Sequence, residues 1–175
     1  MITIDQALQR IRYIPDYPAP GVLFQDITPV LGHAESFRIV VESMSKNPPQ
    51  VDVVVGVEAR GFILGSAIAF HLGLPFIPIR KKGKLPYEVI SQDYGLEYGE
   101  DQIEIHIDAV LPGQKVLLID DVLATGGTLI AAISLIERMN AQVTDISLLS
   151  EIPSLEGRLK INSLYPSVRI HALIS

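Results

Sequence analysis

Two adjacent carboxylates, Asp120 and Asp121, stand between an apolar stretch and a glycine-containing loop. The loop, Ala124-Thr-Gly-Gly-Thr128, offers two hydroxyls and two residues without a β-carbon, directly before a long apolar segment. Backbone N–H groups at the start of a helix bind phosphate well, and glycine lets a ligand approach the backbone closely. Carboxylates repel phosphate, so the acid pair must hold another part of the same ligand, such as sugar hydroxyls or a magnesium ion. The pattern predicts a site for a ribose phosphate.

The elements on either side explain how this loop would be presented. Residues 116–119 are an apolar run, which is typical of a strand buried on both faces of a parallel sheet. Residues 129–139 follow a helical pattern, and another strand is expected near 143–149. The acid pair would then lie at the carboxyl end of a strand, where α/β folds bind ligands. The alternative is an ordinary strand-to-helix turn in which Thr128 is the helix N-cap.

A second expected strand, residues 51–57, also ends in polar residues. It leads into Glu58-Ala-Arg-Gly-Phe62 and then into a helical pattern that reaches residue 72. Because ligands bind outside the carboxyl ends of parallel strands, Arg60 would share a crevice with the loop and could bind a second phosphate group. A surface salt bridge between Arg60 and Glu58 is the alternative.

A run of cations follows a third expected strand at residues 76–79. Arg80-Lys-Lys-Gly-Lys84 places four positive charges in five residues of an acidic chain. Its position at the end of a strand favours a polyphosphate contact over a solvated turn. Residues 85–101 then form a long polar segment that we expect to be a flexible lid loop, and two strands capped by tyrosines are the structural alternative. Further strands are expected at residues 103–107 and 168–174.

The N-terminal part begins with a helix signal and continues into a proline-rich loop. Thr3-Ile-Asp-Gln6 has the form of a capping box, and the helix is expected to continue until Pro15. The loop at residues 16–29 contains Val22, Leu23 and Phe24. This apolar centre either plugs the core or forms a surface on which a flat ligand lies against Phe24.

Composition limits the possible functions. The 175 residues are 48% hydrophobic and 19% charged, which fits one α/β domain with a sizeable core. A net charge of −6 argues against sequence-independent nucleic-acid binding, which needs a basic face. Residues 61–79 lack formal charge over nearly the length of a membrane span, but Gly73-Leu-Pro75 divides them into a helix and a strand. We therefore expect a cytoplasmic protein that contacts neither membrane nor nucleic acid.

Five segments in order resemble the adenine phosphoribosyltransferases, a branch of the type I phosphoribosyltransferase family. They are Pro20-Gly-Val-Leu-Phe-Gln-Asp-Ile-Thr-Pro29, Glu58-Ala-Arg-Gly-Phe62, Arg80-Lys-Lys-Gly-Lys-Leu-Pro86, Leu96-Glu-Tyr-Gly99 and Ile119-Asp-Asp-Val-Leu-Ala-Thr-Gly-Gly-Thr128. The resemblance implies one α/β domain over residues 1–175, with a mostly parallel twisted sheet flanked by helices. Residues 1–33 would form an N-terminal hood over the base, and residues 85–101 a flexible catalytic lid.

The resemblance also implies an activity. The enzyme would transfer the phosphoribosyl group of 5-phosphoribosyl 1-pyrophosphate to adenine, giving AMP and pyrophosphate in purine salvage. A homodimer is implied, as is a Mg²⁺ ion held mainly through the pyrophosphate with the acid pair nearby. Two alternatives stay open: a transferase for hypoxanthine, guanine or xanthine, and a non-catalytic regulator that keeps the fold and binds nucleic acid.

Individual roles follow from the same resemblance. It implies catalytic roles for Glu97, the general acid/base in the lid, and for Arg60, and a cis peptide bond between Glu58 and Ala59. The substrate-binding residues that it implies, grouped by the part of the substrates they would contact, are Ala124, Thr125, Gly126, Gly127 and Thr128 for the 5′-phosphate, Asp120 and Asp121 for the ribose, Ala59, Arg80 and Lys84 for the pyrophosphate, Leu23, Phe24, Gln25 and Val122 for adenine, and Tyr98 in the lid.

Overall fold

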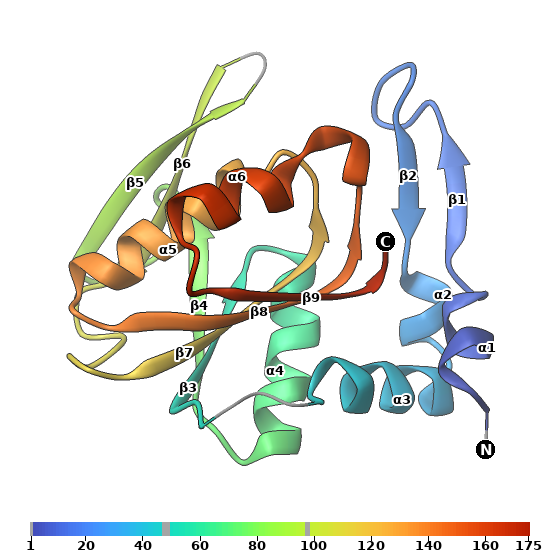
Figure 1. Ribbon diagram of the computed structural model, residues 1–175, viewed down its shortest axis with the longest axis horizontal. Helices are drawn as coiled ribbons and strands as arrows, with labels where there is room; N and C mark the ends of the chain where they lie inside the picture. The colour runs from blue at the N-terminus through green and yellow to red at the C-terminus, as the bar shows by residue number, and fades with distance from the viewer. Residues whose placement is uncertain (1, 47–49, 97–98) are drawn as a thin grey trace. The chain divides into compact units, whose positions relative to one another are not determined.

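The computed structural model describes residues 2–46, 50–96 and 99–175 (Figure 1). Its helices are α1 (Ile4–Leu8), α2 (Thr28–Leu31), α3 (Ala34–Met44), α4 (Arg60–Leu72), α5 (Gly127–Arg138), the 3₁₀ helix η1 (Pro153–Leu155) and α6 (Gly157–Leu164). Its strands are β1 (Arg12–Pro15), β2 (Leu23–Asp26), β3 (Val53–Val57), β4 (Phe76–Lys81), β5 (Val89–Leu96), β6 (Gly99–His106), β7 (Lys115–Leu123), β8 (Gln142–Glu151) and β9 (Arg169–Ile174). Within the described ranges, no helix combines the length and apolar character needed to cross a lipid bilayer.

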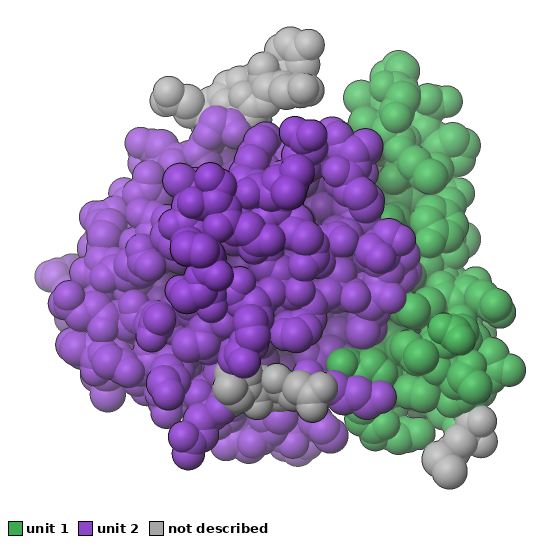
Figure 2. All heavy atoms as spheres, viewed as in Figure 1, with its two compact units in different colours: residues 1–43 green, residues 44–175 purple. Residues whose placement is uncertain are grey.

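The chain divides into two compact units, residues 1–43 and 44–175 (Figure 2). The first unit contains the expected capping box: the Thr3 hydroxyl accepts a hydrogen bond from the Gln6 N–H, and the Gln6 side chain accepts one from the Thr3 N–H. The helix nevertheless ends at Leu8, so the prediction that it reaches Pro15 is wrong. Residues 12–15 instead form β1, because they pair with β2 and this pairing overrides a weak local helix preference.

Strand β2 replaces the expected loop with an apolar centre. Val22 is 43% exposed and Leu23 is 56% exposed, so neither residue plugs a core. Phe24 is partly buried and packs edge-on against Tyr17, with ring centroids 5.1 Å apart. An antiparallel pair of short strands therefore presents Leu23, Phe24 and Gln25 on the first unit.

The second unit is built on a seven-stranded sheet with the order β5-β6-β4-β3-β7-β8-β9. The strands β4, β3, β7, β8 and β9 are each parallel to the next in this order. Strand β6 is antiparallel to both β4 and β5. The mostly parallel α/β sheet is confirmed. All five residues of β3 are buried, because continuous apolar strands suit the centre of a parallel sheet covered on both faces.

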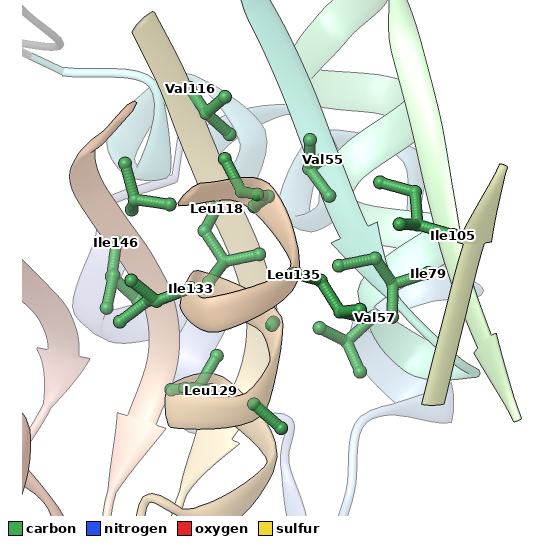
Figure 3. Packing of buried hydrophobic residues seen from close by; sticks show 14 of the residues in the cluster. Val55, Val57, Ile79, Ile105, Val116, Leu118, Leu129, Ile133, Leu135 and Ile146 are labelled. Atoms are coloured by element: carbon green, nitrogen blue, oxygen red, sulfur yellow. The ribbon is translucent and has the colours of Figure 1, made fainter. Parts of the chain in front are cut away.

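The core of this unit lies between the central strands and α5. Figure 3 shows Leu129, Ile133 and Leu135 of α5 in one cluster with Val55 of β3 and Leu118 of β7. Val55 and Leu118 are register partners in the sheet, and both are fully buried. Burying large aliphatic side chains of this kind contributes about 1.5–3 kcal/mol each, which holds α5 against the sheet.

Residues 85–101 were expected to form a flexible loop, and the described part of this segment forms strands instead, while its role as a lid stays a prediction. Strands β5 and β6 form a hairpin whose register runs from Val89 opposite His106 to Leu96 opposite Gly99 (Figure 1). The two-strand alternative is the one observed. The buried side chains of Ile103 and Ile105 anchor β6 in the core, and β5 pairs with it along its whole length.

Candidate active site

The carboxyl ends of β3, β4 and β7 meet at a cavity of about 220 Å³ in the second unit. The sheet register explains the meeting: Val57 lies opposite Ile79, and Gly56 lies opposite Ile119, so the residues that follow emerge together. The cavity is lined by Val57, Glu58, Ala59, Arg60, Lys81, Tyr94, Ile103, Asp120, Asp121 and Thr128. The crevice expected between Arg60 and the Asp120 loop is therefore present.

The acid pair is close to a guanidinium. Nη2 of Arg60 lies 2.7 Å from Oδ2 of Asp121, whose side chain is 9% exposed. The Asp121 N–H donates to Oδ1 of Asp120 at 2.9 Å. Burial raises the pKa of Asp120 well above its ordinary value, and the adjacent charge of Asp121 raises it further. The arrangement suits a ligand that offers hydroxyl donors to the carboxylates.

The loop after β7 forms a second pocket of about 70 Å³ that shares Asp120 and Thr128 with the first. Gly126, with a φ of 84°, is the N-cap of α5, so the alternative that Thr128 caps the helix is wrong. The first N–H groups of a helix lack partners within it and attract anions. The pocket is lined by Asp120, Val122, Leu123, Ala124, Thr125, Gly126, Gly127, Thr128 and Leu129.

Glu58 organises the run of cations after β4. Its carboxylate accepts hydrogen bonds from the Arg80 guanidinium, at 3.2 and 3.3 Å, and from the Lys81 N–H at 2.9 Å. Burial opposes ionisation of Glu58, but hydrogen bonds from Arg80 and Lys81 outweigh it, so the pKa of Glu58 is lowered. Arg80 also donates to the Lys84 carbonyl oxygen at 3.1 Å and lies over the Phe62 ring.

Lys81 lines the 220 Å³ cavity, whereas Arg80 and Lys84 line neither of the two pockets described here. Side chains alternate along a strand, so Lys81 lies on the same side of β4 as buried Ile79, while Arg80 lies on the other. This alternation is the signal in the sequence that could have singled out Lys81. The family resemblance implied that Arg80 and Lys84 bind the pyrophosphate and did not include Lys81.

A tyrosine of the β5–β6 hairpin is a second functional candidate that the sequence reasoning missed. Tyr94 lines the cavity and donates a hydrogen bond to Asp101, its register partner, at 2.9 Å. Burial raises the pKa of Tyr94, and the hydrogen bond to Asp101 raises it further. The tyrosine content of residues 85–101 was visible in the sequence, but which tyrosine faces the cavity depends on strand register.

The remaining expected residues fall into three groups. The peptide bond between Glu58 and Ala59 is cis, as expected. Leu23, Phe24 and Gln25 belong to the first unit, on β2. Glu97 and Tyr98 lie outside the described residues.

Comparison with known proteins matches the site to a family. The model of the phosphoribosyl transferase domain matches residues 35–160. An adenine phosphoribosyltransferase from Chlorobium phaeovibrioides is 52% identical over 87% of this chain and 88% of its own length. The crystal structure of adenine phosphoribosyltransferase from Thermoanaerobacter pseudethanolicus has a TM-score of 0.93 and 44% identity, covering 98% of this chain and 99% of that one.

A third relative was crystallised with ligands. The adenine phosphoribosyltransferase of Trypanosoma brucei, in complex with AMP, pyrophosphate and ribose-5-phosphate, has a TM-score of 0.88 and 25% identity, covering 98% of this chain and 78% of that one. The matched regions thus cover most of this chain. They include the acid pair, the Thr-Gly-Gly-Thr loop and the mostly parallel sheet. The chain belongs to the adenine phosphoribosyltransferases.

Proposed function

We propose that this enzyme transfers the phosphoribosyl group of 5-phosphoribosyl 1-pyrophosphate to adenine, forming AMP and pyrophosphate. The observation that carries the proposal is the pair of adjoining pockets that share Asp120 and Thr128. One pocket has the helix N-terminus that suits a phosphate, the other has cations, and Asp120 lines both. The names of the relatives support adenine as the acceptor, and the ligands of the Trypanosoma brucei enzyme support the products.

Each part of the donor has a matching group of residues. The loop from Ala124 to Thr128 holds the 5′-phosphate through backbone N–H groups and hydroxyls. Asp120 and Asp121 accept hydrogen bonds from the ribose diol. The pyrophosphate lies beside Ala59, Arg60 and Lys81, with Arg80 and Lys84 contributing positive charge from the same turn. As the family resemblance implies, Leu23, Phe24 and Gln25 of β2 bind adenine.

Charge development determines what the residues must do. The bond from the anomeric carbon to a pyrophosphate oxygen breaks, and a ring nitrogen of adenine forms the new bond to that carbon. The sugar gains positive charge while the leaving group takes the electron pair. Arg60 and Lys81 stabilise the departing negative charge, which is electrostatic catalysis by positioned groups. Glu97 acts as the general acid/base that exchanges a proton with the purine ring nitrogen.

The hairpin and the metal complete the site. Residues 85–101 exclude water, which would otherwise hydrolyse the activated sugar. Magnesium, when bound with the donor, neutralises charge on the pyrophosphate. Asp120 and Asp121 fit that ion chemically, because Mg²⁺ prefers hard oxygen ligands and is usually held by one or two carboxylates together with substrate phosphates. We also propose that the enzyme is a homodimer.

One assay tests the activity. The protein is mixed with magnesium, 5-phosphoribosyl 1-pyrophosphate and either adenine, hypoxanthine, guanine or xanthine, and nucleotide formation is followed by chromatography. We expect AMP from adenine and far slower turnover of the other bases. Faster turnover of another base would change the assigned acceptor. No turnover of any base, together with saturable nucleic-acid binding at physiological salt, would favour the regulator instead.

A further inference from the structure

Three polar side chains beside the 220 Å³ cavity form one connected network. Nζ of Lys81 lies 2.9 Å from Oδ2 of Asp101, and the Tyr94 hydroxyl donates a hydrogen bond to the same oxygen at 2.9 Å. The other carboxylate oxygen, Oδ1, accepts a hydrogen bond from the Gln102 N–H at 2.9 Å. Both oxygens of Asp101 are therefore held by donors, which fixes the carboxylate in place.

Asp101 stands behind the residues that face the ligand. Lys81 and Tyr94 line the cavity together with Arg60, and Asp101 contacts both of them from outside that lining. An ammonium group has three N–H donors, and the contact with Asp101 engages one of them. The Lys81 ammonium can therefore keep its contact with Asp101 while it donates to a phosphate oxygen.

Lys81 and Asp101 each favour the charged form of the other. The hydrogen bond and charge of Asp101 raise the pKa of Lys81, and the same contact lowers the pKa of Asp101. A lysine on a strand end, 57% exposed, would otherwise sample many rotamers, and ordering it opposes ligand binding. A fixed carboxylate orders the ammonium before the ligand arrives, which reduces that entropic penalty.

Tyr94 extends the network towards the phosphate loop. It is the cross-strand partner of Asp101 in the hairpin, and its ring lies beside Gly127, where an added β-carbon would be 3.8 Å from its Cδ2. The hairpin, the strand end that carries Lys81 and the loop at the start of α5 thus meet through these side chains.

We propose that Asp101 is a positioning residue that holds the Lys81 ammonium where it binds the pyrophosphate of substrate and product. The inference rests on the proposed function, because it takes pyrophosphate as the occupant of this cavity. Tyr94 keeps Asp101 in place through its hydroxyl. Asp101 itself does not touch the pyrophosphate, so its effect on binding passes through Lys81.

A double-mutant cycle tests this dependence. The dissociation constant of magnesium pyrophosphate is measured by titration calorimetry for the wild type, Asp101→Asn, Lys81→Met and the double variant. We expect Asp101→Asn to weaken binding about two- to fivefold, the range of a partly exposed ion pair. Lys81→Met should weaken it by at least about tenfold, as for a lost charge-assisted hydrogen bond. In the Lys81→Met background, Asp101→Asn should cause no further weakening.

Matched variants separate positioning from folding. Asp93→Asn alters a carboxylate on the same hairpin that accepts a hydrogen bond from the Gln102 side chain, and it should leave pyrophosphate affinity unchanged. Tyr94→Phe keeps the ring and removes only the hydroxyl, so it should weaken binding in the same direction as Asp101→Asn. If Asp101→Asn does not fold, Asp101→Glu, which keeps the charge but moves the carboxylate, replaces it in the cycle with Lys81→Met.

The outcomes are distinct from those of the activity assay. Equal weakening by Asp101→Asn in both backgrounds, or none in either, would overturn the role of Asp101 even in an enzyme that makes AMP. Calorimetry requires no turnover, so coupling between Asp101 and Lys81 would support the positioning role even if adenine proved to be the wrong base.

Discussion

Among single residues, Asp120 has a requirement for function that conflicts with stability. Its carboxylate must be available to the ribose, yet burial and the charge of Asp121 penalise its ionised form, so its pKa is raised well above the ordinary 3.8. The folded protein therefore binds this proton more tightly than the unfolded chain does. By linkage, the ionised carboxylate costs stability that the protonated one does not, and the cost appears as pH rises through the raised pKa.

Asp120→Asn should therefore stabilise the protein at neutral pH while weakening donor binding. We expect the free energy of unfolding to rise, because the amide of Asn carries no charge that burial and the Asp121 carboxylate could penalise. The difference from wild type should vanish well below pH 3.8, where Asp120 is protonated in both the folded and the unfolded state. It should grow as pH rises above 3.8 and level off once pH exceeds the raised pKa of the folded protein. Urea unfolding at several pH values measures it. A gain that stays constant across this pH range would contradict the account.

The lid carboxylate Glu97 gives a second prediction at this scale. Glu97→Gln keeps the size of the side chain and removes its ability to exchange a proton, so kcat should fall by at least about 100-fold, the lower range for general acid–base catalysis. The dissociation constant of adenine should change little. Glu88→Gln, an exposed glutamate in the same segment, is the control. An unchanged kcat in Glu97→Gln would remove this residue from the mechanism.

Elements differ in how far local sequence predicts them. Strands β3 and β7 were predictable because continuous apolar runs suit buried parallel strands, whatever their neighbours. The β1–β2 pair and the β5–β6 hairpin were harder to predict, because these strands carry no continuous apolar run and each is stabilised by pairing with the other. The same distinction holds in the site. The Asp120 to Thr128 segment is contiguous and was predicted, whereas Lys81 meets Asp101 only through strand register.

The phosphate loop and α6 depend on each other through two glycines. A β-carbon on Gly126 would lie 3.1 Å from the Gly157 carbonyl oxygen, and one on Gly157 would clash with the Ala124 carbonyl oxygen and lie 2.7 Å from Cδ1 of Leu123. Backbone atoms cannot move aside as a flexible side chain can. The start of α6 therefore sets the position of the loop from behind, although no sequence motif marks it.

Gly157→Ala should therefore damage both stability and donor binding. We expect a loss of about 1–3 kcal/mol in the free energy of unfolding, typical of overpacking, and a raised KM for 5-phosphoribosyl 1-pyrophosphate because the loop is displaced. Gly95→Ala is the control for stability, since a β-carbon there meets nothing within 4 Å. Denaturant unfolding and initial rates measure the two effects. A stable Gly157→Ala protein with normal KM would show that the loop position does not depend on α6.

At the scale of the whole molecule, the protein and its proposed donor both carry net negative charge. The net charge is −6, and the donor is a polyanion, so binding relies on the local cations Arg60 and Lys81 against a repulsive background. The acid pair adds to that repulsion inside the site. Magnesium carried on the pyrophosphate offsets it, because the ion prefers phosphate and carboxylate oxygens. Composition alone predicted the net negative charge but not this concentration of positive charge at the carboxyl ends of β3 and β4.

Donor and metal should therefore stabilise the fold only together. At a donor concentration about 100 times its dissociation constant, binding adds about 2.7 kcal/mol, which for a chain of this size raises Tm by roughly 5–10 °C. Magnesium alone should leave Tm nearly unchanged, and a chelator should remove most of the donor's effect, because uncompensated phosphates meet the carboxylates of Asp120 and Asp121. Ribose 5-phosphate, which lacks the pyrophosphate, should stabilise less and respond less to the chelator. Thermal unfolding followed by circular dichroism compares these conditions. Equal stabilisation by the donor with and without chelator would mean that the protein's own cations suffice.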